Sequence, residues 1–141
     1  MYRIIFILVL SLLIFNRCKQ ASETVVFDVP QGSYAYFGYD TSSTLVAKGW
    51  FKYEYEDSVN IKGHWKFKKI GNPGNIGPQD GEGELVGMIS DTSVSINLQP
   101  NFADNNIILV GKFDNKYIYG NWQWVTFAGI TNSGKFNSMK N

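Results

Sequence analysis

The chain of 141 residues contains one cysteine and one histidine. A disulfide within the chain is therefore excluded, and these two residues are too few for a zinc site of Cys and His ligands. Its two arginines, Arg3 and Arg17, both precede the cysteine, so the rest of the chain has none. Because phosphates and guanines are read largely through arginine, and the formal net charge is only +1, we expect no nucleic acid partner.

Apolar residues make up 44% of the chain and aromatic residues 16%, which indicates a folded protein with a real core. The length suits one domain with an additional tail. We expect residues 1–17 to be a signal peptide, residues 18–30 a tether and residues 31–141 the folded domain.

An export signal is indicated by the first residues. Arg3 supplies a positive charge, and Ile4–Phe15 is apolar except for Ser11. This run is shorter than the roughly 20 residues of a transmembrane helix but suits a secretory signal. Cys18 follows and resembles the lipidated cysteine of bacterial lipoproteins, which implies a lipid-anchored protein of the bacterial cell envelope. Arg17 departs from the usual small residue before that cysteine, so cleavage near Ala21 and an uncleaved anchor stay as alternatives.

The remaining chain alternates apolar and polar residues between short turn signals, which is typical of antiparallel strands. Short connections favour pairing of consecutive strands, and closing such a meander removes its two exposed edges. We therefore predict an all-β, eight-stranded antiparallel up-and-down barrel. Its strands are expected at Ser33–Tyr39, Thr44–Tyr55, Val59–Lys69, Gly81–Ser90, Thr92–Gln99, Asn106–Phe113, Tyr117–Phe127 and Ser133–Met139.

A glycine followed two residues later by a large apolar residue recurs along these strands, for example as Gly49-x-Phe51 and Gly63-x-Trp65. Both members share the inner face, so each glycine is expected to leave room for a ring from a neighbouring strand. On Thr44–Tyr55, the inner face is predicted to include Tyr55 and the outer face Val46. The glycine pattern resembles the calycin group of lipocalins and avidins, and small uncharacterised bacterial lipoproteins, in architecture only.

Two functions follow from such a barrel. A lipocalin-like carrier would bind a small apolar ligand inside, and the long connection Ile70–Asp80 would cover one mouth. A protein-interaction or inhibitor module would use its outside to bind an envelope protein, and the many inner aromatics favour this reading because they fill the interior. The candidate ligand-binding residues are Tyr53, Trp65, Trp122, Trp124 and Ile76.

Four aromatic residues fall out of phase with the core. Outward rings mark a binding patch or are covered by another segment, here Val25–Val29 or the tether. The candidate interaction patch is Trp50, Tyr117, Tyr119 and Phe127.

Few residues could take part in catalysis or bind a metal. His64 lies between Lys62 and Lys66 on a polar face, without a partner for catalysis. Alternating acids at 80, 82 and 84 suit the outer face of a strand better than a calcium site, and the polar residues 104–106 suit a turn. We expect no enzyme activity, no cofactor and no metal.

Overall fold

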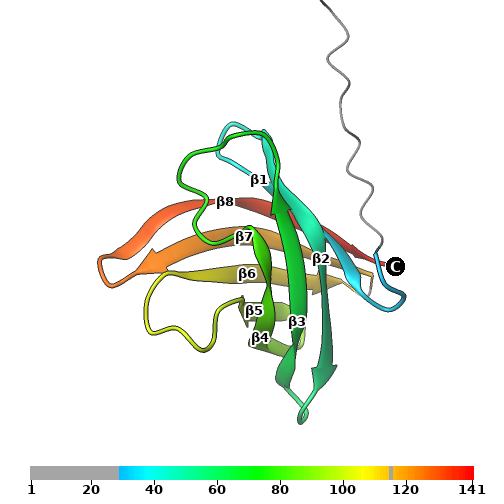
Figure 1. The fold of residues 1–141 in the computed structure, drawn as a ribbon. Helices are drawn as coiled ribbons and strands as arrows, with labels where there is room; N and C mark the ends of the chain where they lie inside the picture. Colours follow the sequence, from blue (N-terminus) through cyan, green and yellow to red (C-terminus); the bar gives the residue numbers. More distant parts are fainter. Residues whose placement is uncertain (1–28, 115) are drawn as a thin grey trace, which may run out of the picture.

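A computed structural model describes residues 29–114 and 116–141, which form a closed barrel of eight strands (Figure 1). Each strand pairs antiparallel with the next, and the first pairs with the last. No helix in the described part of the chain is long and apolar enough to cross a membrane. The strands are β1 (Tyr34–Tyr39), β2 (Leu45–Tyr55), β3 (Asn60–Lys69), β4 (Gly81–Ser90), β5 (Ser93–Asn97), β6 (Asn106–Asp114), β7 (Tyr117–Thr126) and β8 (Gly129–Lys140).

The predicted eight-stranded meander is confirmed, and most strand ends fall within one or two residues of expectation. Strand β8 starts four residues earlier, because Gly129 and Ile130 pair with Thr126 and Val125 in a tight hairpin. Strand β5 ends at Asn97, the last residue that pairs with β4. The next residue, Leu98, donates its N–H to the carbonyl of Ile107.

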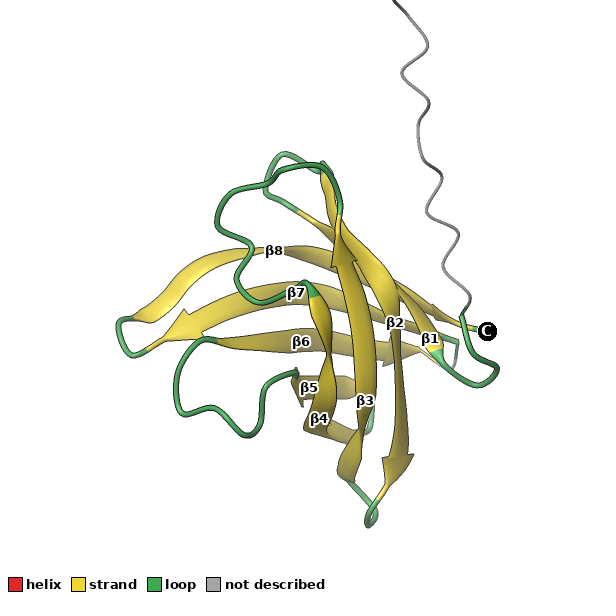
Figure 2. Cartoon of the chain, in the orientation of Figure 1, coloured by secondary structure: helices red, strands yellow, loops and turns green. Residues whose placement is uncertain are grey.

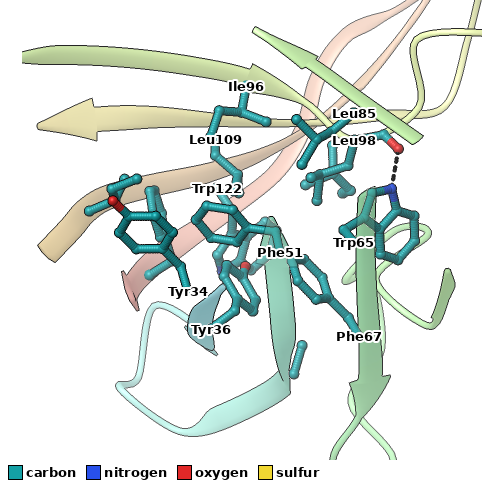
Figure 3. Close-up of a cluster of buried hydrophobic side chains, with 14 of the residues drawn as sticks. Tyr34, Tyr36, Phe51, Trp65, Phe67, Leu85, Ile96, Leu98, Leu109 and Trp122 are labelled. Carbon is teal, nitrogen blue, oxygen red and sulfur yellow. Dashed lines mark hydrogen bonds between the residues drawn. The ribbon is translucent and has the colours of Figure 1, made fainter. Parts of the chain in front are cut away.

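The core fills the barrel interior and comes from alternate residues of every strand (Figure 3). Two positions on β2 differ from the sequence prediction. Val46 is buried rather than outside, because a bulge between Gly38 and Tyr39 leaves Val46 as an extra residue, so it and Ala47 both enter the core. Tyr55 is exposed rather than inside, since β2 there runs past the barrel into the β2–β3 turn.

Most glycines on the inner face lie beside large residues of neighbouring strands, as the repeat predicts, whereas Gly111 pairs with Gly120 and Val94. Gly49 pairs with Tyr36 on one side and Phe67 on the other, and these two rings stack with centroids 4.0 Å apart. Gly134 likewise pairs with Trp122. The strands approach closely at these points, because a Cβ on Gly49 would lie 2.0 Å from the carbonyl oxygen of Lys66. Glycine thus permits the close approach of the strands and leaves room for the neighbouring ring.

The barrel has two different ends (Figure 2). At the loop end, residues 70–80 connect β3 to β4 and turn Ile76 and Gln79 into the core. Gln79 accepts a hydrogen bond from the Tyr36 hydroxyl at 2.8 Å and donates to the carbonyl of Ile76. At the terminus end, Asn141 lies beside the start of the barrel, where its side chain donates to the carbonyl of Val29. The long connection therefore covers one mouth with Ile76 inside, as predicted.

Candidate functional site

The interior tryptophans are structural parts of the barrel wall and core. Trp122 is fully buried, and its indole N–H donates to the carbonyl of Tyr39 at 2.8 Å. The Trp65 indole N–H donates to the carbonyls of Glu84 and Leu98. Both rings already have their hydrogen-bond partners within the protein, so neither leaves a polar group for a ligand to pair with.

The other three candidate ligand residues lie at opposite ends. Trp124 is half-buried at the loop end, where its indole N–H donates to the Asn105 side chain at 2.6 Å, and Ile76 is buried there too. Tyr53 is half-buried near the terminus end, where its hydroxyl lies 3.3 Å from that of Tyr34. The five residues predicted to share a ligand site are therefore distributed over the core and not gathered around one space.

Buried tyrosine hydroxyls are held in their neutral form. Burial raises the pKa of Tyr36, which is enclosed by the core and bonded to Gln79. Burial, followed by the hydrogen bond to Tyr34, raises the pKa of Tyr53. Burial is also the largest cause of the raised pKa of Tyr34. Such hydroxyls are hydrogen-bonding groups of the core at neutral pH rather than bases or nucleophiles.

Five hollows of about 380 to 470 Å³ open on the surface of the barrel or at its loop end. Their volumes reach the range of small-molecule sites, which starts at about 300 Å³. Their walls, however, are made mainly of outer-face and loop residues, and none encloses the set of core side chains. The space inside the barrel is occupied by its own aromatic rings.

The outer surface of β1, β8 and β7 carries a group of exposed apolar side chains, interrupted by Asn137, which we call the aromatic face. Strand register sets Ala35 beside Met139 and Met139 beside Tyr117, while Asn137 lies between Phe37 and Tyr119. Four side chains are well exposed, at 38% for Phe37, 48% for Tyr117, 42% for Tyr119 and 50% for Met139. Tyrosine, phenylalanine and methionine are enriched in protein interfaces.

Charge around the aromatic face is mainly positive. Lys48 pairs with Phe37 in the register, and Lys112 pairs with Tyr119. Lys135 borders a hollow of about 440 Å³ that also touches Tyr119 and Tyr39. The face therefore joins exposed rings, a surface hollow and a lysine border.

The structure brings three of the four predicted patch residues onto one surface. Trp50 pairs with Ala35 across β1 and β2, so it adjoins the aromatic face. Phe127 does not, because it lies eight residues along from Tyr119, about 26 Å in an extended strand. It is 83% exposed in the β7–β8 turn at the loop end. Of the segment Val25–Val29, which was the alternative cover for these rings, the structure describes only Val29, and this residue lies at the terminus end.

Other candidate groups have ordinary structural roles. His64 is exposed. Its two cross-strand neighbours are Lys52, a cation, and Glu84, a carboxylate. The Asp104 carboxylate accepts the backbone N–H groups of Asn105 and Phe127, as expected of a turn. Within residues 29–114 and 116–141, no group of three His, Cys, Asp or Glu side chains could hold a metal.

Some important residues were not identified from the sequence. Gln79 is fully buried, but a lone glutamine in a loop gives no signal of burial. Phe37 and Met139 belong to the aromatic face, and strand alternation would have placed both outside. What alternation cannot give is that β1 and β8, at the two ends of the domain, lie side by side.

Comparison with known proteins finds no matching family model, curated protein or solved structure. The eight-stranded closed antiparallel barrel agrees with the calycin-like architecture, and this agreement concerns the fold alone. Cys18 and the rest of the expected signal peptide and tether lie outside the described residues, apart from the tether's last two residues, 29 and 30.

Proposed function

We propose that this protein is an exported, lipid-anchored β-barrel that acts as a non-enzymatic protein-interaction or inhibitor module in the bacterial cell envelope. The observation that carries the proposal is the aromatic face, a run of exposed Phe, Tyr and Met side chains on a sheet whose inner side is fully packed. Lysines around it suit a partner with an acidic border, because complementary charge speeds and orients association.

A carrier function inside the barrel has less support. Tyr36, Phe51, Trp122 and Phe136 are fully buried and occupy the interior where a lipocalin-like ligand would lie. Stacking of Tyr36 on Phe67 and of Tyr34 on Phe51 fills the space further. A ligand would have to displace these rings from a close-packed core, which is costly.

The aromatic face can be tested by paired substitutions. We expect Phe37→Ser with Tyr119→Ser to abolish capture of the partner from envelope extract, since central aromatic residues of an interface typically cost 2 kcal/mol or more when truncated. Phe127→Ser is the matched control, because that ring is more exposed but lies away from the face. Captured proteins would be compared by mass spectrometry. Equal capture by all three proteins would contradict the proposal, provided that the variants melt like the native protein.

Lipid anchoring can be tested through Cys18. We expect the chain to incorporate a palmitate label in bacteria and to lose it in the Cys18→Ser variant, which removes the thiol that would carry the lipid. Signal peptide cleavage at that position should also fail, giving a larger product on a gel. Label retained in the variant, or absent from the native chain, would contradict anchoring through Cys18.

A further inference from the structure

Strand β4 is paired along only part of one side. It pairs with β3 from Gly81 to Met88, but with β5 only from Val86 to Ser90. Beyond Asn97 the chain turns toward β6. Among the described residues, no strand therefore pairs with the second side of β4 between Gly81 and Leu85, and the wall of the barrel has an open edge there.

The direction of the backbone groups on this edge follows from the ladder. Ile89 donates its N–H to the carbonyl of Val59, the residue before β3. Since backbone groups alternate in direction along a strand, Glu82 and Glu84 turn theirs to the open side. The Trp65 indole N–H bonds the carbonyl of Glu84 at 3.1 Å, and it also bonds that of Leu98 (Figure 3). Trp65 thus closes one end of the gap, and the Gln99 side chain donates to the carbonyl of Pro78 across the other, which leaves the backbone of Glu82 facing the gap between them.

A surface groove of about 390 Å³ lies along this edge. Its wall includes Asp80, Glu82 and Glu84, and the Phe102 ring, which is 66% exposed. Lys66 neutralises Glu82 at 2.9 Å, and Asn101 donates to Glu84 at 3.1 Å. The groove therefore combines an unpaired strand edge, a net negative border and one apolar ring.

We propose that the open edge of β4 binds a short extended peptide segment rich in lysine or arginine, which adds a strand beside Gly81–Gly83 and pairs with the backbone of Glu82. An exposed edge is a template for strand addition, in which backbone bonds give affinity and alternate side chains give specificity. The outward side chains of the added strand would lie beside Glu82 and Glu84, where opposite charge is favourable. Apolar residues of the segment would contact Phe102.

This inference deepens the proposed interaction function and rests on it, because it gives the partner a chemical character at a second surface. That surface is separate from the aromatic face, so the two tests can fail independently. If the face variants lose the partner but the edge binds no peptide, only the edge proposal is wrong. If the edge binds peptide but the face variants capture normally, only the role of the face is wrong.

The test is a titration of the full chain, held in detergent micelles, followed by amide NMR shifts. The probe is a blocked pentapeptide of alternating lysine and valine. We expect shifts in the 80–85 and 98–102 segments. Methylating alternate backbone nitrogens of the probe should weaken binding about tenfold, since it removes donors to the strand edge. A probe of alternating glutamate and valine should not bind.

Two variants complete the test. Glu84→Gln keeps an acceptor for Asn101 but removes the charge, and we expect it to weaken binding about two- to fivefold. Asp91→Asn is the matched control, because it removes an exposed acid in the distant β4–β5 turn and should leave binding unchanged. Absence of binding, shifts mapped elsewhere, or equal binding of the methylated probe would overturn the proposal.

Discussion

Replacing Trp122 with alanine should reduce the free energy of unfolding by about 3–5 kcal/mol, as is typical of a fully buried tryptophan. The ring has no exposed surface, lies beside Leu109 and Gly134 in the sheet, and donates its N–H to the carbonyl of Tyr39. Alanine would leave a cavity and also remove this hydrogen bond. A domain of this kind has only about 5–15 kcal/mol in total, so the variant should melt at a much lower temperature.

Tyr119→Ala serves as the control for this experiment. Tyr119 lies three residues before Trp122 on β7, on the outer face, and we expect a loss of about 1 kcal/mol or less. Urea unfolding followed by far-ultraviolet circular dichroism measures both variants. If Trp122→Ala unfolded at the same urea concentration as the native protein, the assignment of this face of β7 to the core would be wrong.

The architecture was predictable because its signals are local. Strict alternation on β3, with Ile61, Trp65 and Phe67 inside, fixes which face is buried. Short turns then require neighbouring strands to pair, and closure follows from the cost of two open edges. The glycine repeat added a specific expectation, which the pairing of Gly134 with Trp122 confirms.

The misplaced residues depend on contacts that local patterns do not contain. Val46 entered the core because β1 and β2 differ by one residue at the bulge, and nothing in the alternation of β2 alone marks it. Gln79 is buried because Tyr36, 43 residues earlier, offers its hydroxyl. The gap beside β4 likewise depends on where the chain leaves β5.

The candidate surfaces illustrate the same limit. The sequence predicted that Tyr117 and Tyr119 lie on the outside. They share one surface with Phe37 only because β8 lies between β7 and β1. Trp65 was expected as a ligand contact, yet its N–H closes one end of the gap between Glu84 and Leu98. The pattern thus predicted which residues face inward or outward, whereas their neighbours required the barrel.

Replacing Gly49 with alanine should cost about 3 kcal/mol, at the upper end of what inserting a methyl group into a packed core costs. The new Cβ would lie 2.0 Å from the carbonyl oxygen of Lys66 and 2.7 Å from the Cα of Phe67. Both are backbone atoms of the neighbouring strand, so they cannot rotate away as a flexible side chain would. Relief would require β3 to move from β2, which would also disturb the stacking of Tyr36 on Phe67.

Gly74→Ala provides the matched control for Gly49→Ala. Gly74 lies in the connection between β3 and β4, and a Cβ there would meet no heavy atom within 4 Å. We expect it to be neutral or to stabilise by up to about 1 kcal/mol, because alanine restricts the unfolded chain more than glycine does. Comparing the free energies of unfolding of the two variants in urea separates the effect of crowding at position 49 from the general effect of replacing a glycine. Equal stabilities would mean that close strand approach is not what requires glycine at position 49.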